Sequence, residues 1–296
     1  MEKTGCTLCP RRCGANRTTG RGQCGMGARL RVARAALHTG EEPCLCVERG
    51  AGAVFFSGCA LHCVFCQNAE ISQRGFGKEI GTAQLAEIFL RLQDEGAQTL
   101  DLVSPTHFAP QIARALERAK PRLRIPVVYN SNGYDSPEAL GMMDGLVEIY
   151  LPDLKYKDAA LSKAYSGAAD YFDVAQAAIQ EMYRQTGPLQ WGANGVLQRG
   201  LMVRHLLLPG CRKDSMAVLE ALSRLAPPRH ILLSLMSQYT PCYRAAAYKE
   251  IDRRVTDFEI DSVRDYAVRL GFEGYGQARS AADSRYTPAF DLTGVW

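Results

Sequence analysis

Long apolar runs are missing from this chain of 296 residues. No stretch approaches the ~18 to 20 apolar residues that a bilayer span requires, and the first six residues, Met-Glu-Lys-Thr-Gly-Cys, lack the apolar segment of a secretion signal. Apolar residues make up 47% and charged residues 22%, which excludes a disordered chain. We therefore expect a folded cytoplasmic protein with no membrane partner.

Acidic residues are nearly absent from the first 40 positions. This stretch contains eight Lys or Arg and one acid, Glu2, a net charge of +7, whereas the whole chain carries +4. Such a segment can bind nucleic acid or an acidic partner, or its arginines can offset the negative charge of nearby thiolates. No aromatic residues that could stack on bases interleave with these arginines, which disfavours nucleic acid and favours the role beside thiolates.

Cysteine, by contrast, is abundant and unevenly placed. Nine of the eleven cysteines precede residue 67. Because a reducing compartment keeps thiols free, clustered cysteines in a protein without a secretion signal indicate metal ligands or nucleophiles rather than disulfides.

Six short β-branched or aliphatic runs alternate with helical patterns after residue 50. One such helical pattern, from Leu85 to Leu92, has Thr82 as its expected N-cap and Gly96 just past its end. Parallel strands joined by helical crossovers explain the alternation. Six units are too few for a closed eight-stranded barrel, so we expect an α/β fold: a partial (β/α)6 TIM-like barrel over 49–296, preceded by a small Cys-rich metal-binding segment over 1–48. The six runs are 53–57, 98–103, 125–130, 146–151, 201–206 and 231–236.

Residues that follow these runs are candidates for a site, because TIM-like barrels place their sites at the carboxyl ends of the strands. Residues 58–66, Gly-Cys-Ala-Leu-His-Cys-Val-Phe-Cys, follow the first run and contain the spacing CxxxCxxC. Three thiolates this close suit three corners of one iron–sulfur cubane and leave its fourth iron open for a substrate. A zinc site would need His62 or a remote residue as its fourth ligand.

The motif and its flanks, residues 55–72, resemble the radical S-adenosylmethionine (SAM) superfamily, and especially its pyruvate formate-lyase activating enzyme-like proteins of the PflX type. The resemblance covers nearly the whole chain. It implies that Cys59, Cys63 and Cys66 hold a [4Fe-4S] cluster whose open iron is chelated by SAM. It also implies that one electron cleaves the sulfonium bond, that the resulting 5′-deoxyadenosyl radical abstracts a hydrogen atom, and that Phe65 packs near the adenine.

The resemblance extends to the strand ends, where it implies the rest of the SAM site. Ser104, Thr106 and His107 stand where most of the superfamily has a Gly-Gly-Glu type turn, and this turn can still bond the SAM zwitterion. His107 can equally be a helix N-terminal residue without a catalytic task. Asn130 and Asn132 resemble the family's Thr-Asn-Gly turn, whose amides match ribose and adenine, although Asx residues beside Gly also form ordinary turns.

Four further polar residues complete the predicted site. Asp153 and Lys155 match the Asp-Leu-Lys of glycyl-radical activases, where both charges lie at the SAM site; a plain surface ion pair is the alternative. His205 and Gln238 stand among apolar strand residues, so they either line the cavity or are satisfied core groups. We take Lys155, His205 and Gln238 as the catalytic candidates.

A second set of cysteines lies in a glycine-rich stretch that cannot bury enough apolar area to fold without a metal. Four thiolates suit either zinc or an iron–sulfur cluster, and the spacing does not decide between them. PflX-type proteins carry a similar segment. Cys44 and Cys46 lie outside the pattern and can add ligands, while loosely placed free thiols are the alternative without a metal. The set consists of Cys6, Cys9, Cys13 and Cys24.

The resemblance implies an oxidoreductase of the glycyl-radical-activase type. It would act on a protein or peptide and take its electron from a donor such as flavodoxin or ferredoxin. One alternative is radical modification of a small molecule or peptide precursor with the help of an auxiliary iron–sulfur cluster. Another is a non-enzymatic metal-binding interaction module that docks through the basic N-terminal segment.

Overall fold

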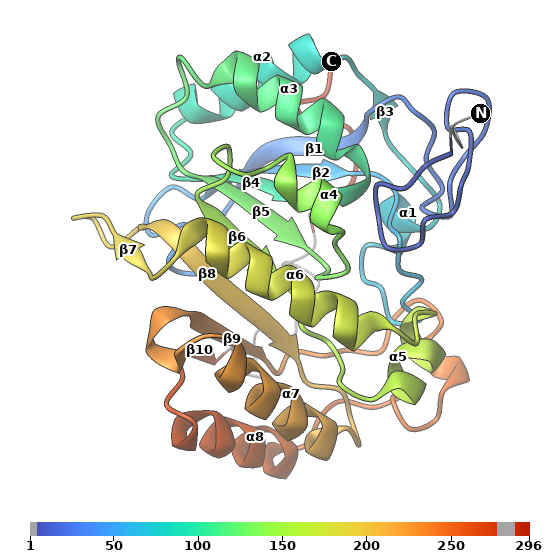
Figure 1. Ribbon diagram of the computed structural model, residues 1–296, viewed down its shortest axis with the longest axis vertical. Coiled ribbons are helices and arrows are strands. Elements are labelled where there is room, and N and C mark those ends of the chain that lie inside the picture. Colours follow the sequence, from blue (N-terminus) through green and yellow to red (C-terminus); the bar gives the residue numbers. More distant parts are fainter. Residues whose placement is uncertain (1–4, 277–287) are drawn as a thin grey trace.

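One continuous sheet organises the residues that the computed structural model describes, 5–276 and 288–296. The sheet order is β10-β9-β8-β6-β5-β4-β2-β1-β3. The seven neighbouring strands β10, β9, β8, β6, β5, β4 and β2 run parallel to one another. All six expected strands are present, and the partial TIM-like barrel is confirmed (Figure 1). They are β2 (Ala51–Phe56), β4 (Leu100–Val103), β5 (Val127–Ser131), β6 (Ile149–Pro152), β8 (Leu197–Leu206) and β9 (Leu232–Met236).

Four more strands were not expected from the sequence. β10 (Glu273–Gly276) adds a seventh parallel strand beside β9, and β7 (Gln190–Trp191) forms a short antiparallel pair with β8. β1 (Arg31–His38) pairs antiparallel with both β2 and β3 (Lys78–Glu79). β1 therefore takes residues from the Cys-rich stretch 1–48 into the main sheet, while the division at residue 48 stays a prediction.

The longer helices lie outside the sheet, as the crossover connections require (Figure 1). The one expected from Leu85 to Leu92 buries that face against the core, but its N-cap is Gly81 rather than Thr82, which is its first helical residue. No helix in the described ranges combines the length and apolar character needed to cross a membrane. The helices are α1 (Ala69–Ser72), α2 (Thr82–Asp94), α3 (Ala109–Ala119), α4 (Pro137–Gly141), α5 (Ala159–Ser166), α6 (Tyr171–Thr186), α7 (Arg212–Leu225) and α8 (Asp257–Arg269).

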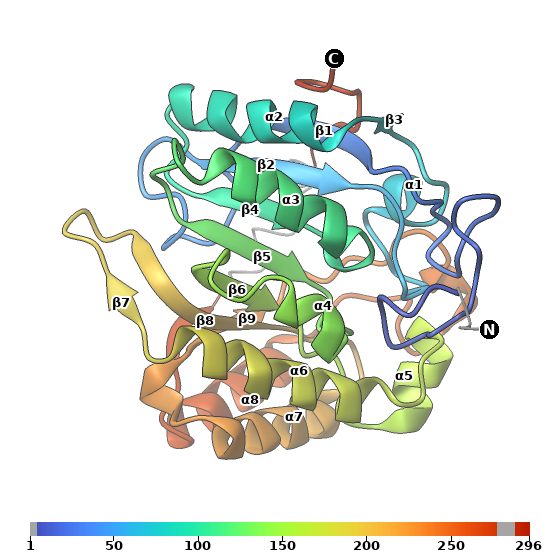
Figure 2. The ribbon, with the colours of Figure 1, turned by 45° about the horizontal axis from the view of Figure 1, so that its top comes forward.

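The two groups of N-terminal cysteines lie at opposite ends of the strands. Residues 5–30 form loops beside α1 and α5, at the carboxyl ends of the parallel strands (Figure 2). Because β1 runs antiparallel to β2, the chain then returns to the amino ends. There Cys44 packs with Leu197 and Met202 of β8, and its carbonyl accepts a hydrogen bond from the Leu197 amide. This placement does not favour the suggestion that Cys44 and Cys46 add ligands to the second set, Cys6, Cys9, Cys13 and Cys24.

Glu42 is a buried acid in the segment that follows β1. One of its carboxylate oxygens accepts a hydrogen bond of 2.7 Å from Ser234, and the other is buried without a hydrogen-bond partner. Burial, with help from the neighbouring Glu41, raises the pKa of Glu42 to about 7.

We expect Glu42→Gln to stabilise the protein at pH 8 but hardly at pH 5. An acid whose pKa is higher in the folded than in the unfolded chain destabilises the fold as pH rises from about 4.5 towards 7. A tenfold difference in acidity corresponds to ~1.4 kcal/mol, so the ionised carboxylate costs at most about 3 kcal/mol. Urea unfolding of the cluster-free protein at both pH values measures the difference in free energy of unfolding between Glu42→Gln and the parent. Glu117→Gln, an exposed position on α3, controls for charge loss, and an equal gap at pH 5 and pH 8 would contradict the assignment.

Candidate active site at the carboxyl ends of the strands

The cluster loop, residues 57–68, follows β2 and is held by segments distant in sequence. The Cys59 amide donates to the Cys24 carbonyl at 3.2 Å. The His62 and Val64 amides donate to the carbonyls of Ser166 and Tyr165 at 3.2 and 2.8 Å. An irregular loop has no ladder of its own, so these bonds satisfy its backbone and fix its path.

Each of the three thiols of this loop has a hydrogen-bonding neighbour. The Cys59 sulfur accepts from the Leu61 amide at 3.4 Å and from the Asn132 side chain at 3.2 Å. The Cys63 sulfur lies 3.0 Å from the Ser166 hydroxyl, and the Cys66 sulfur 3.2 Å from the Ser72 hydroxyl. Donors aimed at sulfur stabilise thiolates, so the three residues suit the role of cluster ligands.

Burial disfavours the ionised form of the thiols in this loop. Burial, together with the neighbouring thiols, raises the pKa of Cys59 to about 12 and that of Cys66 to about 11. In the described ranges, no three or more His, Cys, Asp or Glu side chains gather around one position suited to a single metal ion. The thiolates of a cubane bind different iron atoms and so stand apart, which is compatible with that finding. His62 is exposed, and its Nδ1 contacts the Gln73 side chain at 2.7 Å.

A buried ion triad follows β6. Lys155 Nζ lies 2.5 Å from one oxygen of Asp153, and Arg204 Nε donates to the other at 2.9 Å. Burial disfavours the ionised Asp153 carboxylate, but Arg204 and Lys155 outweigh it and lower its pKa. Burial likewise disfavours charged Lys155, yet Asp153 and Cys63 raise its pKa. A plain surface pair would be exposed, whereas both side chains of this pair are only 14% exposed.

The asparagines after β5 connect the triad to the cluster loop. Asn130 accepts from Arg204 Nη2 at 2.6 Å and donates to the buried Asp101 at 3.2 Å. Asn132 donates to the Cys59 sulfur, and its side-chain oxygen accepts from the Tyr134 amide. The structure thus brings Asn132 to the thiols, whereas both amide groups of Asn130 already have protein partners.

The turn after β4 is mostly engaged with the protein itself. The Thr106 hydroxyl donates to Asp135 at 2.5 Å, and His107 Nε2 contacts the Ser57 carbonyl at 2.7 Å. Ser104 has φ of +60°, an uncommon backbone conformation for a side-chain-bearing residue that costs about 1 to 3 kcal/mol and concentrates at functional sites.

His205 and Gln238 both carry a buried polar atom without a hydrogen-bond partner, His205 Nε2 and Gln238 Oε1. His205 Nδ1 contacts the Leu154 carbonyl at 2.6 Å, and burial lowers the His205 pKa to about 4, so its ring is neutral at pH 7. Phe65 is buried edge-on against Tyr239, with ring centroids 5.8 Å apart. A buried polar atom without a hydrogen-bond partner destabilises the fold, and a bound ligand that supplies the missing hydrogen bond removes that cost.

Three residues of the site were not recognised from the sequence. Arg204 brings a guanidinium into the otherwise largely apolar strand run 201–206, and this pattern could have revealed it. Ser166 reaches Cys63 from α5, and Tyr171 bonds the carbonyls of the turns after β5 and β6 from α6. Nothing in the local sequence marks either of these two, because their partners are remote.

Residues 5–30 dock directly on the cluster loop. Arg11 Nε donates to the Ala60 carbonyl at 2.9 Å, and its Nη1 donates to the Gly167 carbonyl. Arg17 donates to the His107 and Gly27 carbonyls, and its charge contributes to the lowered pKa of Cys13, whereas burial outweighs it at Cys24 and raises the pKa of that thiol. The expected role of the arginines beside thiolates thus fits Arg17, whereas Arg11 contacts backbone carbonyls. Burial, with help from the charges of the other three thiols of the second set, raises the pKa of Cys9 to about 11, so the four lie near one another.

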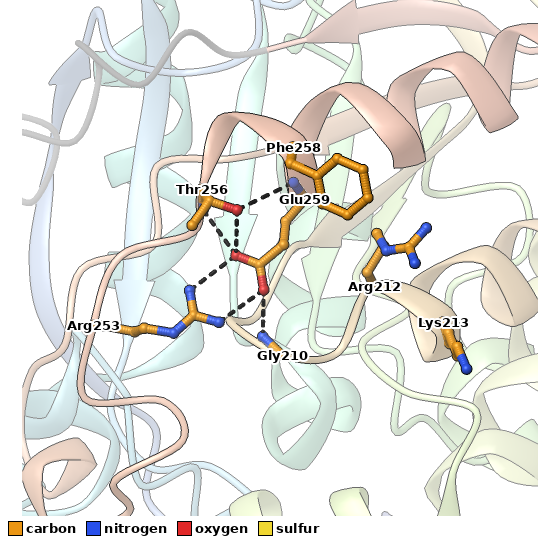
Figure 3. Close-up of a pocket in the computed structure, with 7 residues that line it drawn as sticks. All are labelled: Gly210, Arg212, Lys213, Arg253, Thr256, Phe258 and Glu259. Atoms are coloured by element: carbon orange, nitrogen blue, oxygen red, sulfur yellow. Dashed lines mark hydrogen bonds and ion pairs between the residues drawn. The ribbon is translucent and has the colours of Figure 1, made fainter.

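A surface hollow of about 320 Å³ lies beyond β8, beside Cys211 (Figure 3). Glu259 holds it together by accepting from Arg253, Thr256 and the Gly210 amide. Phe258, which is 69% exposed, lies under the guanidinium of Arg212, 4.9 Å from its carbon to the ring centroid. None of the predicted site residues lines this hollow.

An open parallel barrel with a three-cysteine loop after its first parallel strand defines a class of cluster-dependent enzymes. Residues 53–163 match the family model of the Radical SAM superfamily, so this part of the chain is similar to a radical SAM domain. Proteins of this family use a [4Fe-4S] cluster and SAM. The cluster loop, Ser104–His107, Asn130 and Asn132, and the Asp153–Lys155 pair all lie within the matched range.

Similar proteins support the fold. An uncharacterized protein of Methanocaldococcus jannaschii is 29% identical over 282 residues, covering 90% of this chain and 75% of that protein. Streptococcus suis SuiB bound to its precursor peptide SuiA has a TM-score of 0.53 and 13% identity over 74% of this chain and 46% of SuiB, so the chain matches less than half of SuiB. Methylornithine synthase (PylB) has a TM-score of 0.52 and 13% identity over 80% of this chain and 68% of that enzyme.

Proposed function

We propose that this protein reductively cleaves SAM at a [4Fe-4S] cluster held by Cys59, Cys63 and Cys66, and that it abstracts a hydrogen atom from a protein or peptide. The observation that carries the proposal is the set of three thiols with hydrogen-bonding neighbours, beside a buried Asp153–Lys155–Arg204 triad. When bound, the cluster supplies the electron that cleaves SAM.

The protein's own residues divide the remaining tasks. Asp153 and Lys155 offer fixed charges of opposite sign, matched to the ammonium and carboxylate of an amino-acid zwitterion. Asn132 orients Cys59 through its hydrogen bond to the sulfur, and Ser104 and Phe65 contact SAM. His205 Nε2 and Gln238 Oε1 provide buried hydrogen-bonding atoms that a substrate can engage. Lys155, His205 and Gln238 remain the catalytic candidates.

The substrate class is supported by the surface at the carboxyl end of β8. Its exposed Phe258, stacked under Arg212, offers an aromatic and cationic contact typical of protein interfaces. The fold itself does not distinguish a peptide substrate from a small molecule. It is shared by SuiB, which was solved with a precursor peptide, and by methylornithine synthase. Glycyl-radical activation of a partner protein is our preferred form of the reaction.

We also propose that Cys6, Cys9, Cys13 and Cys24, which the described structure does not gather around a single-metal position, draw together to hold a second metal centre, zinc or an iron–sulfur cluster. The proximity of the four thiols supports it, because Cys24, Cys6 and Cys13 each add to the effect of burial in raising the pKa of Cys9. Metal analysis distinguishes the two, because zinc indicates a structural role whereas clearly more than four irons per chain indicates an auxiliary cluster. The latter result would favour modification of a small molecule or peptide precursor.

The test is anaerobic reconstitution, reduction with dithionite and incubation with SAM, followed by quantification of 5′-deoxyadenosine. We expect Cys59→Ala, Cys63→Ala and Cys66→Ala each to abolish the product, because each removes one iron ligand. Cys46→Ala, at the opposite end of the barrel, is the matched control and should retain it. Product formation by the three variants would refute the cluster assignment, and a parent protein that neither binds SAM nor forms product would favour the interaction module.

A further inference from the structure

The Cys63 sulfur is reached from outside the cluster loop by the hydroxyl of Ser166, the last residue of α5. The sulfur and the hydroxyl oxygen lie 3.0 Å apart, and Ser166 is fully buried. The Cys66 sulfur has a similar neighbour in Ser72, but that residue is only six positions away in the sequence and is half-buried. The contact at Cys63 therefore joins the loop to a separate helix.

A second buried hydroxyl lies behind Ser166. The Tyr156 hydroxyl is 2.9 Å from Ser166 Oγ, and Tyr156 is only 1% exposed. Within the described ranges, the Tyr156 hydroxyl has no other hydrogen-bonding neighbour, and the Ser166 hydroxyl has none besides Tyr156 and Cys63. The three side chains thus form a short chain that ends on the sulfur.

The number of protons fixes the direction of this chain. A cysteine binds iron as a thiolate, so the Cys63 sulfur accepts hydrogen bonds and has no proton to donate. Ser166 has a single hydroxyl proton and must donate it to the sulfur. The Ser166 oxygen is then the acceptor for Tyr156. Because hydrogen bonds in a chain polarise one another, Tyr156 strengthens the donation by Ser166.

Both hydroxyls are held in place by their surroundings. The Ser166 carbonyl accepts from the His62 amide at 3.2 Å, so Ser166 contacts the cluster loop twice. The Tyr156 ring packs edge-on against Tyr171, with centroids 5.6 Å apart, and its centroid lies 6.4 Å from that of Tyr165. Donors that are fixed in advance stabilise added negative charge without having to reorganise.

From this geometry we propose that Tyr156 and Ser166 raise the reduction potential of the [4Fe-4S] cluster through their hydrogen-bond chain to Cys63. The inference rests on the proposed function, since it concerns the same cluster. Hydrogen bonds to the sulfurs are among the factors that set cluster potentials. Reduction adds one electron from an external reductant such as dithionite, while the protons stay on Ser166 and Tyr156. Donors to sulfur stabilise the added negative charge, so the two hydroxyls make reduction more favourable.

The experiment measures the midpoint potential of each reconstituted variant by dithionite titration with redox mediators and electron paramagnetic resonance. The signal that changes on addition of SAM belongs to the cluster with the open iron. We expect Ser166→Ala to make reduction about ten-fold less favourable, because a hydrogen bond to a charged group is lost. This is a downward shift of about 59 mV for one electron. Tyr156→Phe should shift the potential in the same direction but by less, since the Ser166 hydroxyl remains.

Ser162→Ala is the matched control. Ser162 is buried one turn earlier on α5, and its hydroxyl donates to the Ala159 carbonyl instead of a cluster ligand. This variant removes the same group from the same helix and should keep the parent potential.

A double variant tests the order of the chain. If Tyr156 acts only through Ser166, then Ser166→Ala/Tyr156→Phe has the same potential as Ser166→Ala. The double variant also removes the buried Tyr156 hydroxyl that Ser166→Ala leaves without a partner, which favours folding. If neither variant with Ser166→Ala holds the cluster, Tyr156→Phe decides alone, and an unchanged potential in it contradicts the proposal.

Three further outcomes would overturn the proposal. The first is a potential like that of the parent in both variants that lack the Ser166 hydroxyl. The second is an equal shift in Ser162→Ala, which would assign the effect to the packing of α5. The third is a further shift when Tyr156→Phe is added to Ser166→Ala, because Tyr156 would then not act through Ser166. A parent that assembles no cluster, judged by iron content and absorbance, refutes the proposed function instead.

Discussion

Arg204→Met is expected to lower the free energy of unfolding by about 3 to 5 kcal/mol, because removing one partner of a buried ion pair leaves the other charge uncompensated. Arg204 donates to Asp153 at 2.9 Å and to Asn130 at 2.6 Å, and lies 3.9 Å from Glu41. Methionine fills similar volume but offers no donor, so Asp153 would depend on Lys155 alone. Urea unfolding of the cluster-free protein measures the loss.

The control applies the same substitution to an exposed ion pair. Arg224 lies 2.5 Å from Glu220 on α7, but its side chain is 70% exposed, against 18% for Arg204. Arg224→Met should cost at most about 0.5 kcal/mol, the usual value for a surface pair. If the two arginine variants lose similar stability, the triad does not hold the site. Adding Asp153→Asn to Arg204→Met should restore part of the loss, since it removes the unpaired charge.

Gly58→Ala is expected to remove most of the cluster from the protein. Gly58 has φ of +89°, and a Cβ there would lie 2.4 Å from Met26 Cγ and 2.7 Å from the Cys24 carbonyl oxygen. The Met26 side chain can move, but the Cys24 carbonyl is the acceptor for the Cys59 amide. The overlap would therefore push the cluster loop away from residues 5–30.

A matched glycine isolates the effect of this contact. Gly25 has φ of +79° with open space around the Cβ position, so Gly25→Ala carries only the left-handed backbone cost of about 1 to 2 kcal/mol. Overpacking at Gly58 adds about 1 to 3 kcal/mol, which corresponds to roughly a ten- to hundred-fold loss of occupancy if it falls on the loaded state. Iron content and visible absorbance measure the cluster occupancy of each variant. Equal iron in the two variants would show that the contact is dispensable.

The sequence predicted the barrel well because its parallel strands are buried on both faces and read as continuous apolar runs. β2 and β4 are buried at every position. β10 escaped notice because Glu-Gly-Tyr-Gly has no apolar run, and it owes its strand conformation to pairing with β9. β1, Arg-Val-Ala-Arg-Ala-Ala-Leu-His, was overlooked because its alanines carry little strand preference.

The sequence predicted site residues only where residues of the right chemical type also stand at a characteristic spacing. Cys59, Cys63 and Cys66 stand close in sequence, so their common purpose could be inferred before any fold was known. The Ser166 contact with Cys63 joins residues 103 positions apart and depends on how α5 ends against the loop. The engagement of Thr106 with Asp135 depends likewise on the packing of two turns. Hydroxyl groups gave no periodic signal that could have revealed either contact.

The way the cluster loop is held has a consequence for its assembly. The amides of Cys59, His62, Val64 and Cys66 all have carbonyl acceptors, three of them outside the loop. Such amides should exchange slowly with deuterated solvent even before iron is added, unlike those of an ordinary surface loop. A scaffold already fixed in this way loses little conformational entropy on metal insertion. The polypeptide should therefore adopt nearly its final conformation before the cofactor arrives.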